Sequence, residues 1–133
     1  MELEPYLFFE GNCEEALAFY GTVFGGEVAS LHRYEGSPME GEIPPELKTK
    51  VMHASFVAGS LKFMAADIMA GLHTGDGHVS LSLAASDAAA GERVFGELSQ
   101  GGNVRMPWGD VFWGGKFGMV TDKFGIAWMV SAH

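Results

Sequence analysis

Apolar residues recur at every second position between Val79 and Leu83, and polar residues such as His78 and Ser80 occupy the positions between them. A period of two is typical of a strand that packs on one face and leaves the other face free. The pattern therefore predicts a strand over residues 77–85. His78 and Ser80 are expected on its polar face, where a ligand can reach them.

The predicted elements follow the same order in both halves of the chain. The first half predicts a strand, a helix and three strands, at 5–9, 12–24, 27–34, 51–57 and 61–66. The second half predicts the same series at 77–85, 87–100, 104–106, 116–120 and 126–130. Such a recurrence indicates an internal repeat. We expect one domain, residues 1–133, in which a glycine-rich connector at 68–77 separates unit one (about 1–67) from unit two (about 78–133).

The start of the first helix carries two further expectations. Asn12 and Glu15 have the spacing of a capping box, in which both side chains bond backbone N–H groups at the helix start. Cys13 lies where the helix dipole lowers a thiol pKa, so it is either a nucleophile or, as is commoner, a small buried residue.

The segment 35–50 holds glycines and prolines that break regular structure, and it is compatible with a lid, a dimer contact or a plain surface loop.

The charge of the chain argues against a nucleic-acid partner. Seventeen acidic and eight basic residues give a formal net charge of -9, whereas a phosphate backbone attracts clustered Lys and Arg. No apolar run approaches the ~20 residues that cross a bilayer, and the first residues lack the basic start of a signal peptide. A single cysteine excludes an intrachain disulfide and a multi-thiolate zinc site. We expect a cytoplasmic protein that binds neither nucleic acid nor membrane.

Several segments carry a resemblance to a known family. They are Pro5-Tyr6-Leu7-Phe8-Phe9, Gly11-Asn12-Cys13-Glu14-Glu15-Ala16, Phe19-Tyr20, Phe24-Gly25-Gly26, Met52-His53-Ala54, Phe112-Trp113-Gly114, Phe117-Gly118 and Phe124-Gly125 with Trp128. Together they resemble the PhnB-like branch of the vicinal oxygen chelate superfamily, which includes glyoxalase I, bleomycin and fosfomycin resistance proteins and extradiol dioxygenases. The resemblance implies an α+β fold in which two βαβββ units form an eight-stranded curled mixed sheet around a cavity.

The resemblance also implies where a metal would bind. Metal-using members place four His or Glu ligands on the first and last strands of each unit. The matching positions here hold Pro5, Phe63 or Met64, His78 and Met129. Proline and phenylalanine cannot ligate a cation, and a thioether is a poor ligand for Zn, Mg or Mn, so no metal cofactor is expected.

A different set of donors remains an alternative. His53 and His78 would form a two-imidazole site if both faced the cavity, completed by Glu10, Asp67 or Asp110. His32, His73 and His133 are expected on the surface or in loops.

Two functions of different classes follow. The first is a protein that binds a small molecule without a metal, in a cavity lined by aromatic and apolar groups with a few polar groups. Its expected residues are His53, Phe63, His78, Ser80, Trp108, Phe112, Trp113 and Met129. The second is a divalent-metal enzyme of lyase, isomerase or dioxygenase type, in which the metal stabilises an enolate-like anion and His78 or Glu10 moves the proton. Relatives often carry a demethylubiquinone methyltransferase label, but the chain lacks the length and the glycine-rich loop of a doubly wound methyltransferase.

Members of this length usually form dimers, often by exchanging units between chains. The flexible connector at 68–77 allows such an exchange. We therefore expect a two-fold homodimer that buries well over the roughly 1,200 Å² typical of specific interfaces. Residues 5–10 and 79–83 are expected at or near that interface.

Overall fold

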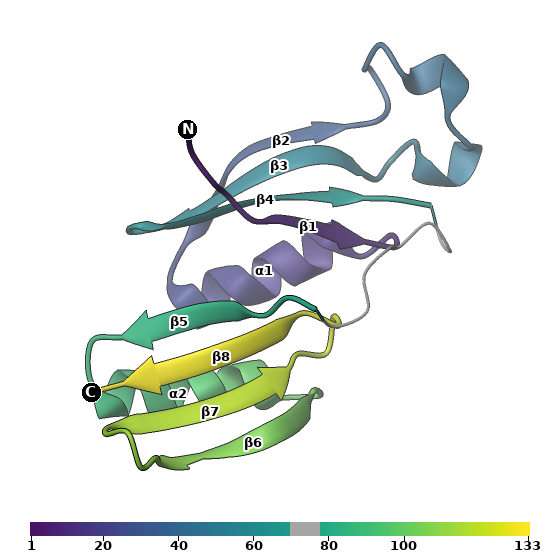
Figure 1. Ribbon diagram of the computed structural model, residues 1–133. Helices are drawn as coiled ribbons and strands as arrows, with labels where there is room; N and C mark the ends of the chain where they lie inside the picture. Colours follow the sequence, from purple (N-terminus) through teal and green to yellow (C-terminus); the bar gives the residue numbers. More distant parts are fainter. Residues whose placement is uncertain (70–77) are drawn as a thin grey trace. The chain divides into compact units, whose positions relative to one another are not determined.

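The computed structural model describes residues 1–69 and 78–133, which form two compact units, Met1–Thr74 and Gly75–His133 (Figure 1). Each unit contains one four-stranded sheet and one α-helix. Most of the connector expected at 68–77, including His73, lies outside the described residues. No helix among the described residues is long and apolar enough to span a membrane.

Unit one folds as the predicted strand, helix and three strands. Its elements are β1 (Tyr6–Phe9), α1 (Cys13–Phe24), β2 (Glu27–Arg33), β3 (Val51–Ala58) and β4 (Leu61–Asp67). The sheet order is β1-β4-β3-β2, with β1 parallel to β4 and the other pairs antiparallel. The first strand therefore lies beside the last, which brings the start of α1 close to the end of β4.

Helix α1 packs on one face of this sheet and leaves the other face without a helix. On the covered face, Phe56 and Phe63 stack with ring centroids 4.8 Å apart, and Tyr20 of α1 meets Phe63 edge-on at 5.8 Å. In β1, Leu7 and Phe9 are buried on this side. Because side chains alternate along a strand, Tyr6 and Phe8 lie on the uncovered face.

Unit two repeats the same topology. Its elements are β5 (Leu81–Ala85), α2 (Ala88–Ser99), β6 (Asn103–Asp110), β7 (Lys116–Thr121) and β8 (Ala127–Ala132), and the sheet order is β5-β8-β7-β6. Position by position this is the order of unit one, with the first strand again parallel to the last. The prediction of two βαβββ units is confirmed, and their eight strands are divided between two mixed sheets of four.

Helix α2 begins and packs as the sequence indicates. The side chain of Asp87 accepts a hydrogen bond from the backbone N–H of Ala90 at 2.8 Å and so caps the helix. Gly118 of β7 lies under the helix, where a Cβ would come within 2.6 Å of the Phe95 ring. Trp128 and Val130 of β8 are buried on the same covered face.

Three local expectations were wrong. The strand expected over 77–85 begins only at Leu81, where its pairing with Trp128 of β8 starts. Strand β6 runs on through Pro107, which an edge strand tolerates at an irregularity in its pairing. The segment 35–50 contains two short 3-10 helices, η1 (Glu40–Glu42) and η2 (Pro45–Leu47).

The capping box at the start of α1 does not form. Asn12 makes no side-chain capping bond. The carboxylate of Asp67, at the end of β4, instead accepts hydrogen bonds from the N–H groups of Gly11 and Cys13, both at 2.9 Å.

Candidate functional site

The uncovered face of the sheet in unit one carries a cluster of aromatic and imidazole groups. The hydroxyl of Tyr6 and Nδ1 of His53 are hydrogen-bonded at 2.9 Å, with the donor set by the histidine tautomer. The ring of Phe8 stacks on Tyr6 at 4.8 Å and nearly parallel, and Phe8 is 45% exposed. We call Tyr6, Phe8 and His53 the Tyr-His cluster. The cluster combines an accessible aromatic ring, that of Phe8, with an imidazole that the hydrogen bond to Tyr6 holds in one orientation.

The environment keeps the phenol of Tyr6 protonated. Burial, followed by the nearby Tyr34 and Cys13, raises the pKa of Tyr6 above its ordinary value. The phenol therefore stays neutral at physiological pH. It acts as a hydrogen-bonding group rather than as a base.

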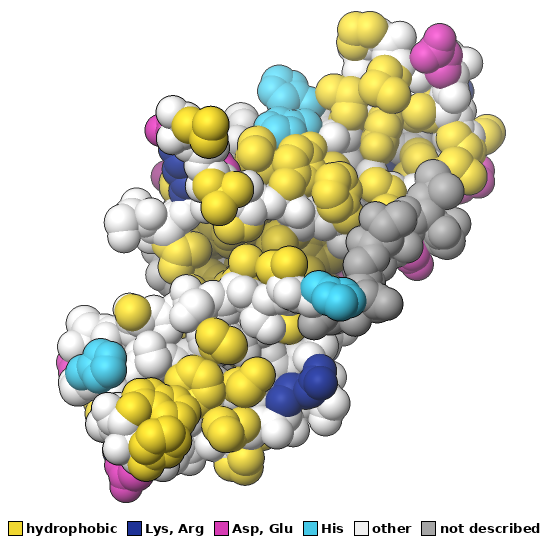
Figure 2. Space-filling view, viewed as in Figure 1, with side chains coloured by type: hydrophobic (Ala, Val, Ile, Leu, Met, Phe, Trp, Pro, Cys, Tyr) yellow, Lys and Arg dark blue, Asp and Glu magenta, His cyan; other side chains and the backbone are white. Residues whose placement is uncertain are grey.

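The uncovered face of the sheet in unit two is rich in thioether and aromatic side chains. Met106 pairs with Met119 between β6 and β7, and Met119 pairs with Met129 between β7 and β8. We call these three residues the methionine row. Phe117, two positions before Met119, meets Trp113 edge-on at 5.7 Å. Figure 2 shows hydrophobic side chains gathered over β6, β7 and β8 on this face, with a basic group beside them.

The residues that the sequence nominated as a binding site are divided between the two units. His53 lies in the Tyr-His cluster, while Met129, Phe112 and Trp113 lie in unit two, with Phe112 96% and Trp113 55% exposed. His78 and Ser80 are exposed residues ahead of β5.

Phe63 and Trp108 pack against the helices instead. Trp108 is 5.9 Å from the ring of Phe95 and fills the space above Gly91, both in α2. Its indole N–H is buried and has no hydrogen-bond partner among the described residues. These two aromatics therefore belong to the core of their units.

The first and last strands of each unit pair poor metal donors on the uncovered face of the sheet. On the uncovered faces, the paired residues of the first and last strands are Tyr6 with Met64 in unit one and Ser82 with Met129 in unit two. Two thioethers, a neutral phenol and an aliphatic hydroxyl do not suit a hard divalent cation. Within residues 1–69 and 78–133, no three His, Cys, Asp or Glu side chains are grouped to hold a metal ion.

The carboxylates that the sequence offered as extra ligands have other surroundings. Asp67 is 1% exposed, and its oxygens accept three backbone N–H bonds, from Gly11, Cys13 and Val51. Asp110 forms an exposed ion pair with Lys116 at 3.0 Å. Glu10 is exposed at the end of β1.

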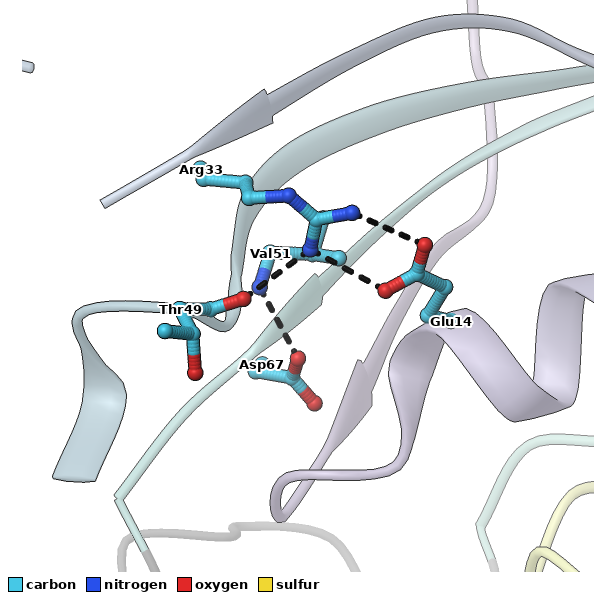
Figure 3. A network of polar contacts seen from close by, with 5 residues as sticks. All are labelled: Glu14, Arg33, Thr49, Val51 and Asp67. Atoms are coloured by element: carbon cyan, nitrogen blue, oxygen red, sulfur yellow. Dashed lines mark hydrogen bonds and ion pairs between the residues drawn. The ribbon is translucent and has the colours of Figure 1, made fainter. Parts of the chain in front are cut away.

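A polar cleft of about 580 Å³ opens beside the start of α1. Its lining residues are Gly11, Glu14, Glu15, Arg33, Glu35, Thr49, Lys50 and Asp67. The guanidinium of Arg33 donates to both carboxylate oxygens of Glu14, at 3.0 and 2.8 Å, and to the carbonyl of Thr49 at 2.9 Å (Figure 3). These bonds lower the pKa of Glu14. Arg33 and Glu14 thus neutralise each other, and the other charged residues of the lining are Glu15, Glu35, Asp67 and Lys50.

Cys13 is not an activated nucleophile. The side chain is fully buried, and burial, with smaller contributions from Asp67 and Glu14, raises the pKa of its thiol to about 12. Asp67 places a negative charge where a helix start alone would favour the thiolate. Of the two readings left open by the sequence, the structural cysteine fits.

Sequence reasoning missed Tyr6 and Asp67 as organising residues. Tyr6 could have been found from the alternation in β1, which places it opposite Leu7 and Phe9. Asp67 carries no local signal, because its hydrogen-bond partners lie as far as 56 residues away.

Comparison with known proteins places the chain in a family. Residues 1–131 match the family described as 3-demethylubiquinone-9 3-methyltransferase. The chain belongs to this family. The protein YjdN of Escherichia coli K12 is 31% identical, with 98% of this chain and 95% of the relative covered.

Solved structures agree with this assignment. Protein PA1353 from Pseudomonas aeruginosa is 41% identical with a TM-score of 0.87, covering 100% of this chain and 98% of its own. The putative 3-demethylubiquinone-9 3-methyltransferase, PhnB protein, from Bacillus cereus is 30% identical with a TM-score of 0.84, covering 100% of both chains. A glyoxalase/bleomycin resistance protein/dioxygenase domain from Frankia sp. EAN1pec, 14% identical with a TM-score of 0.69 over 99% of this chain and 96% of its own, shares the fold. The chain is thus a PhnB-like protein with the glyoxalase/bleomycin resistance fold.

Proposed function

We propose that this PhnB-like protein binds a small planar molecule through the Tyr-His cluster, without a metal ion. The observation that carries the proposal is the 2.9 Å bond between Tyr6 and His53 beside the exposed, stacked ring of Phe8. Aromatic rings offer large contact area at low entropic cost, and one oriented polar pair selects the ligand's direction.

The character of the ligand follows from the groups that face it. The rings of Tyr6 and Phe8 stack on each other with their planes 11° apart, and Phe8, which is 45% exposed, offers apolar ring surface to a planar ligand. His53 uses Nδ1 for Tyr6, so Nε2 remains to bond a ligand oxygen or N–H. A planar ring with an oxygen substituent, such as a phenol or a quinone, satisfies both requirements.

The proposed absence of a metal rests on donor chemistry. Met64 and Met129 stand at last-strand positions where a hard divalent ion would need His or Glu. Elemental analysis of untagged protein tests this part. Stoichiometric bound Zn, Ni or Mn would instead support the divalent-metal enzyme expected as the alternative.

A ligand panel tests the binding proposal. We suggest phenols, naphthols and short-chain quinones, the last because the family description names a demethylubiquinone. Thermal shift and calorimetry should detect at least one ligand, and Tyr6→Phe and His53→Gln should each weaken its binding by roughly tenfold. His32→Gln is the matched control, since His32 is the partner of His53 across β2 and β3 but has no bond to Tyr6. Binding by no member of the panel, or equal loss in all three variants, would contradict the proposal.

We further propose that the protein works as a two-fold homodimer in the cytoplasm. Both sheets end in edge strands, and Phe112, Trp113 and Val79 are strongly exposed apolar residues, which favours association. Light scattering at micromolar concentration should give twice the chain mass of 14.3 kDa. A mass of one chain that does not change with concentration would refute the dimer.

A further inference from the structure

We propose that the methionine row of unit two is a thioether site for a soft monovalent metal ion, Cu(I). The proposal concerns Met106, Met119 and Met129 and is independent of the binding function of the Tyr-His cluster. Three of the chain's eight methionines lie on one line across three neighbouring strands. No covalent or redox step is involved, because the ion binds in the reduced state in which it is supplied.

Strand register brings the three side chains together. Directly opposed residues in antiparallel strands have Cβ atoms about 4.5–5.5 Å apart on the same face. Met119 is opposed by Met106 on one side and by Met129 on the other. Each methionine has three rotatable bonds beyond its backbone, so three sulfurs at this spacing can converge on one ion.

The row lies on the face that α2 leaves uncovered. The residues next to the row in sequence lie on the opposite face, which α2 covers. They are Gly118 and Val120 in β7, and Trp128 and Val130 in β8. The extra residue on β6 between Val104 and Met106 is a bulge, which puts Met106 back in register with Met119. Met106 is 40% exposed, so an ion can reach the row from this face.

The chemistry of the donors selects the ion. Thioethers are neutral, soft ligands that favour Cu(I), whereas Zn, Mg and Mn prefer imidazole or oxygen. The row has no carboxylate or imidazole in register with it, since its fourth partner, opposite Met129 on β5, is Ser82. The only thiol of the chain, Cys13, is fully buried in unit one and does not compete for the ion.

Competition against a Cu(I)-selective chelator, under anaerobic and reducing conditions, tests the site. The wild-type chain should bind one equivalent of Cu(I), and Met119→Leu should weaken binding by roughly tenfold or more, because it removes the central sulfur. Leucine replaces methionine with little change in volume, so the fold is retained. Met39→Leu, at a 46% exposed methionine in the loop of unit one, is the matched control and should bind as the wild type does.

Two further measurements keep the result interpretable. X-ray absorption of the Cu(I) complex should show sulfur as the main neighbour of the metal, and far-UV circular dichroism should be unchanged in Met119→Leu. Equal Cu(I) affinity in Met119→Leu and Met39→Leu, or a metal surrounded by nitrogen, would overturn the proposal, as would the absence of any stoichiometric binding.

Discussion

The carboxylate of Asp67 accepts a hydrogen bond at 2.9 Å from the backbone N–H of Cys13, 54 residues earlier in the chain. The bond joins the last residue of β4 to the first residue of α1. The other carboxylate oxygen of Asp67 accepts from Val51 N–H, which is fully buried. One side chain thus fixes the helix start and the first residue of β3.

Asp67→Asn should destabilise the protein by about 1–3 kcal/mol. An amide keeps one acceptor oxygen, so its NH₂ group must face a buried N–H donor, most simply that of Val51. Urea unfolding measures the loss. Asp110→Asn is the control, because its exposed ion pair with Lys116 should contribute no more than about 1 kcal/mol. Similar losses in both variants would show that Asp67 does not organise unit one.

The thiol of Cys13 should make stability fall at alkaline pH. Its pKa is near 12 in the folded protein and 9.0 as an ordinary thiol, so the unfolded chain releases this proton first. The contribution of Cys13 is fully present below pH 9 and is lost as pH rises from 9 toward 12. The free energy of unfolding should therefore decline less steeply above pH 9 in Cys13→Ala than in the wild type. The substitution also removes the smallest of the three contributions that raise the pKa of Tyr6, which acts in the same direction. Parallel slopes would contradict the raised pKa.

Gly118→Ala and Gly96→Ala should have opposite effects on unit two. A Cβ at Gly118 would lie 2.6 Å from the Phe95 ring, so the variant should lose about 1–3 kcal/mol through overpacking. Gly96 lies in α2 with no atom within 4 Å of its added Cβ, and alanine there should gain about 0.5–1 kcal/mol. Thermal unfolding distinguishes the two, and a stabilised Gly118→Ala would show that α2 adjusts freely.

Two tryptophans of unit two should differ in what their indole N–H groups contribute. Trp128 donates to Asp122 at 2.8 Å, and Asp122 is 3% exposed. Trp108 has no hydrogen-bond partner for its buried N–H within the described residues. Trp128→Phe should therefore cost about 1–3 kcal/mol more than Trp108→Phe in denaturant unfolding. Equal losses in the two variants, or a larger loss in Trp108→Phe, would contradict the prediction.

The order and type of elements could be predicted from the sequence, because side-chain periodicity and turn residues are local signals. The residues at which the strands begin and end depend on the neighbouring strands, whose positions the local sequence does not reveal. His78 and Ser80 continue the alternation of β5, yet the pairing of β5 with β8 begins only at Leu81 and Trp128. Pro107 argues against a strand only where its missing N–H would be needed, and β6 is paired on one side only.

The surroundings of the nominated side chains depend on the same long-range pairing. His53 was nominated for its chemistry, but its bond to Tyr6 depends on the register of β1 against β4 and of β4 against β3. Phe63 and Trp108 are aromatic residues of the kind that line ligand-binding sites. Each lies on the side of its sheet that a helix covers, so both pack against helices instead. Phe63 and Met64 are adjacent in β4, so their side chains lie on opposite faces of the sheet.

The pairing of the first strand with the last strand of the same unit also affects how quickly each sheet can fold. Every strand pair among the described residues joins two strands of the same unit, and the first sheet is complete at Asp67. Chain segments that must meet are therefore separated by at most one unit, which shortens the conformational search relative to a sheet spanning the whole chain. During synthesis, all the strands of unit one are available before β5 has left the ribosome. Pulse-labelling of nascent chains should find the amides of β3 and β4 protected from hydrogen exchange while unit two is still being made.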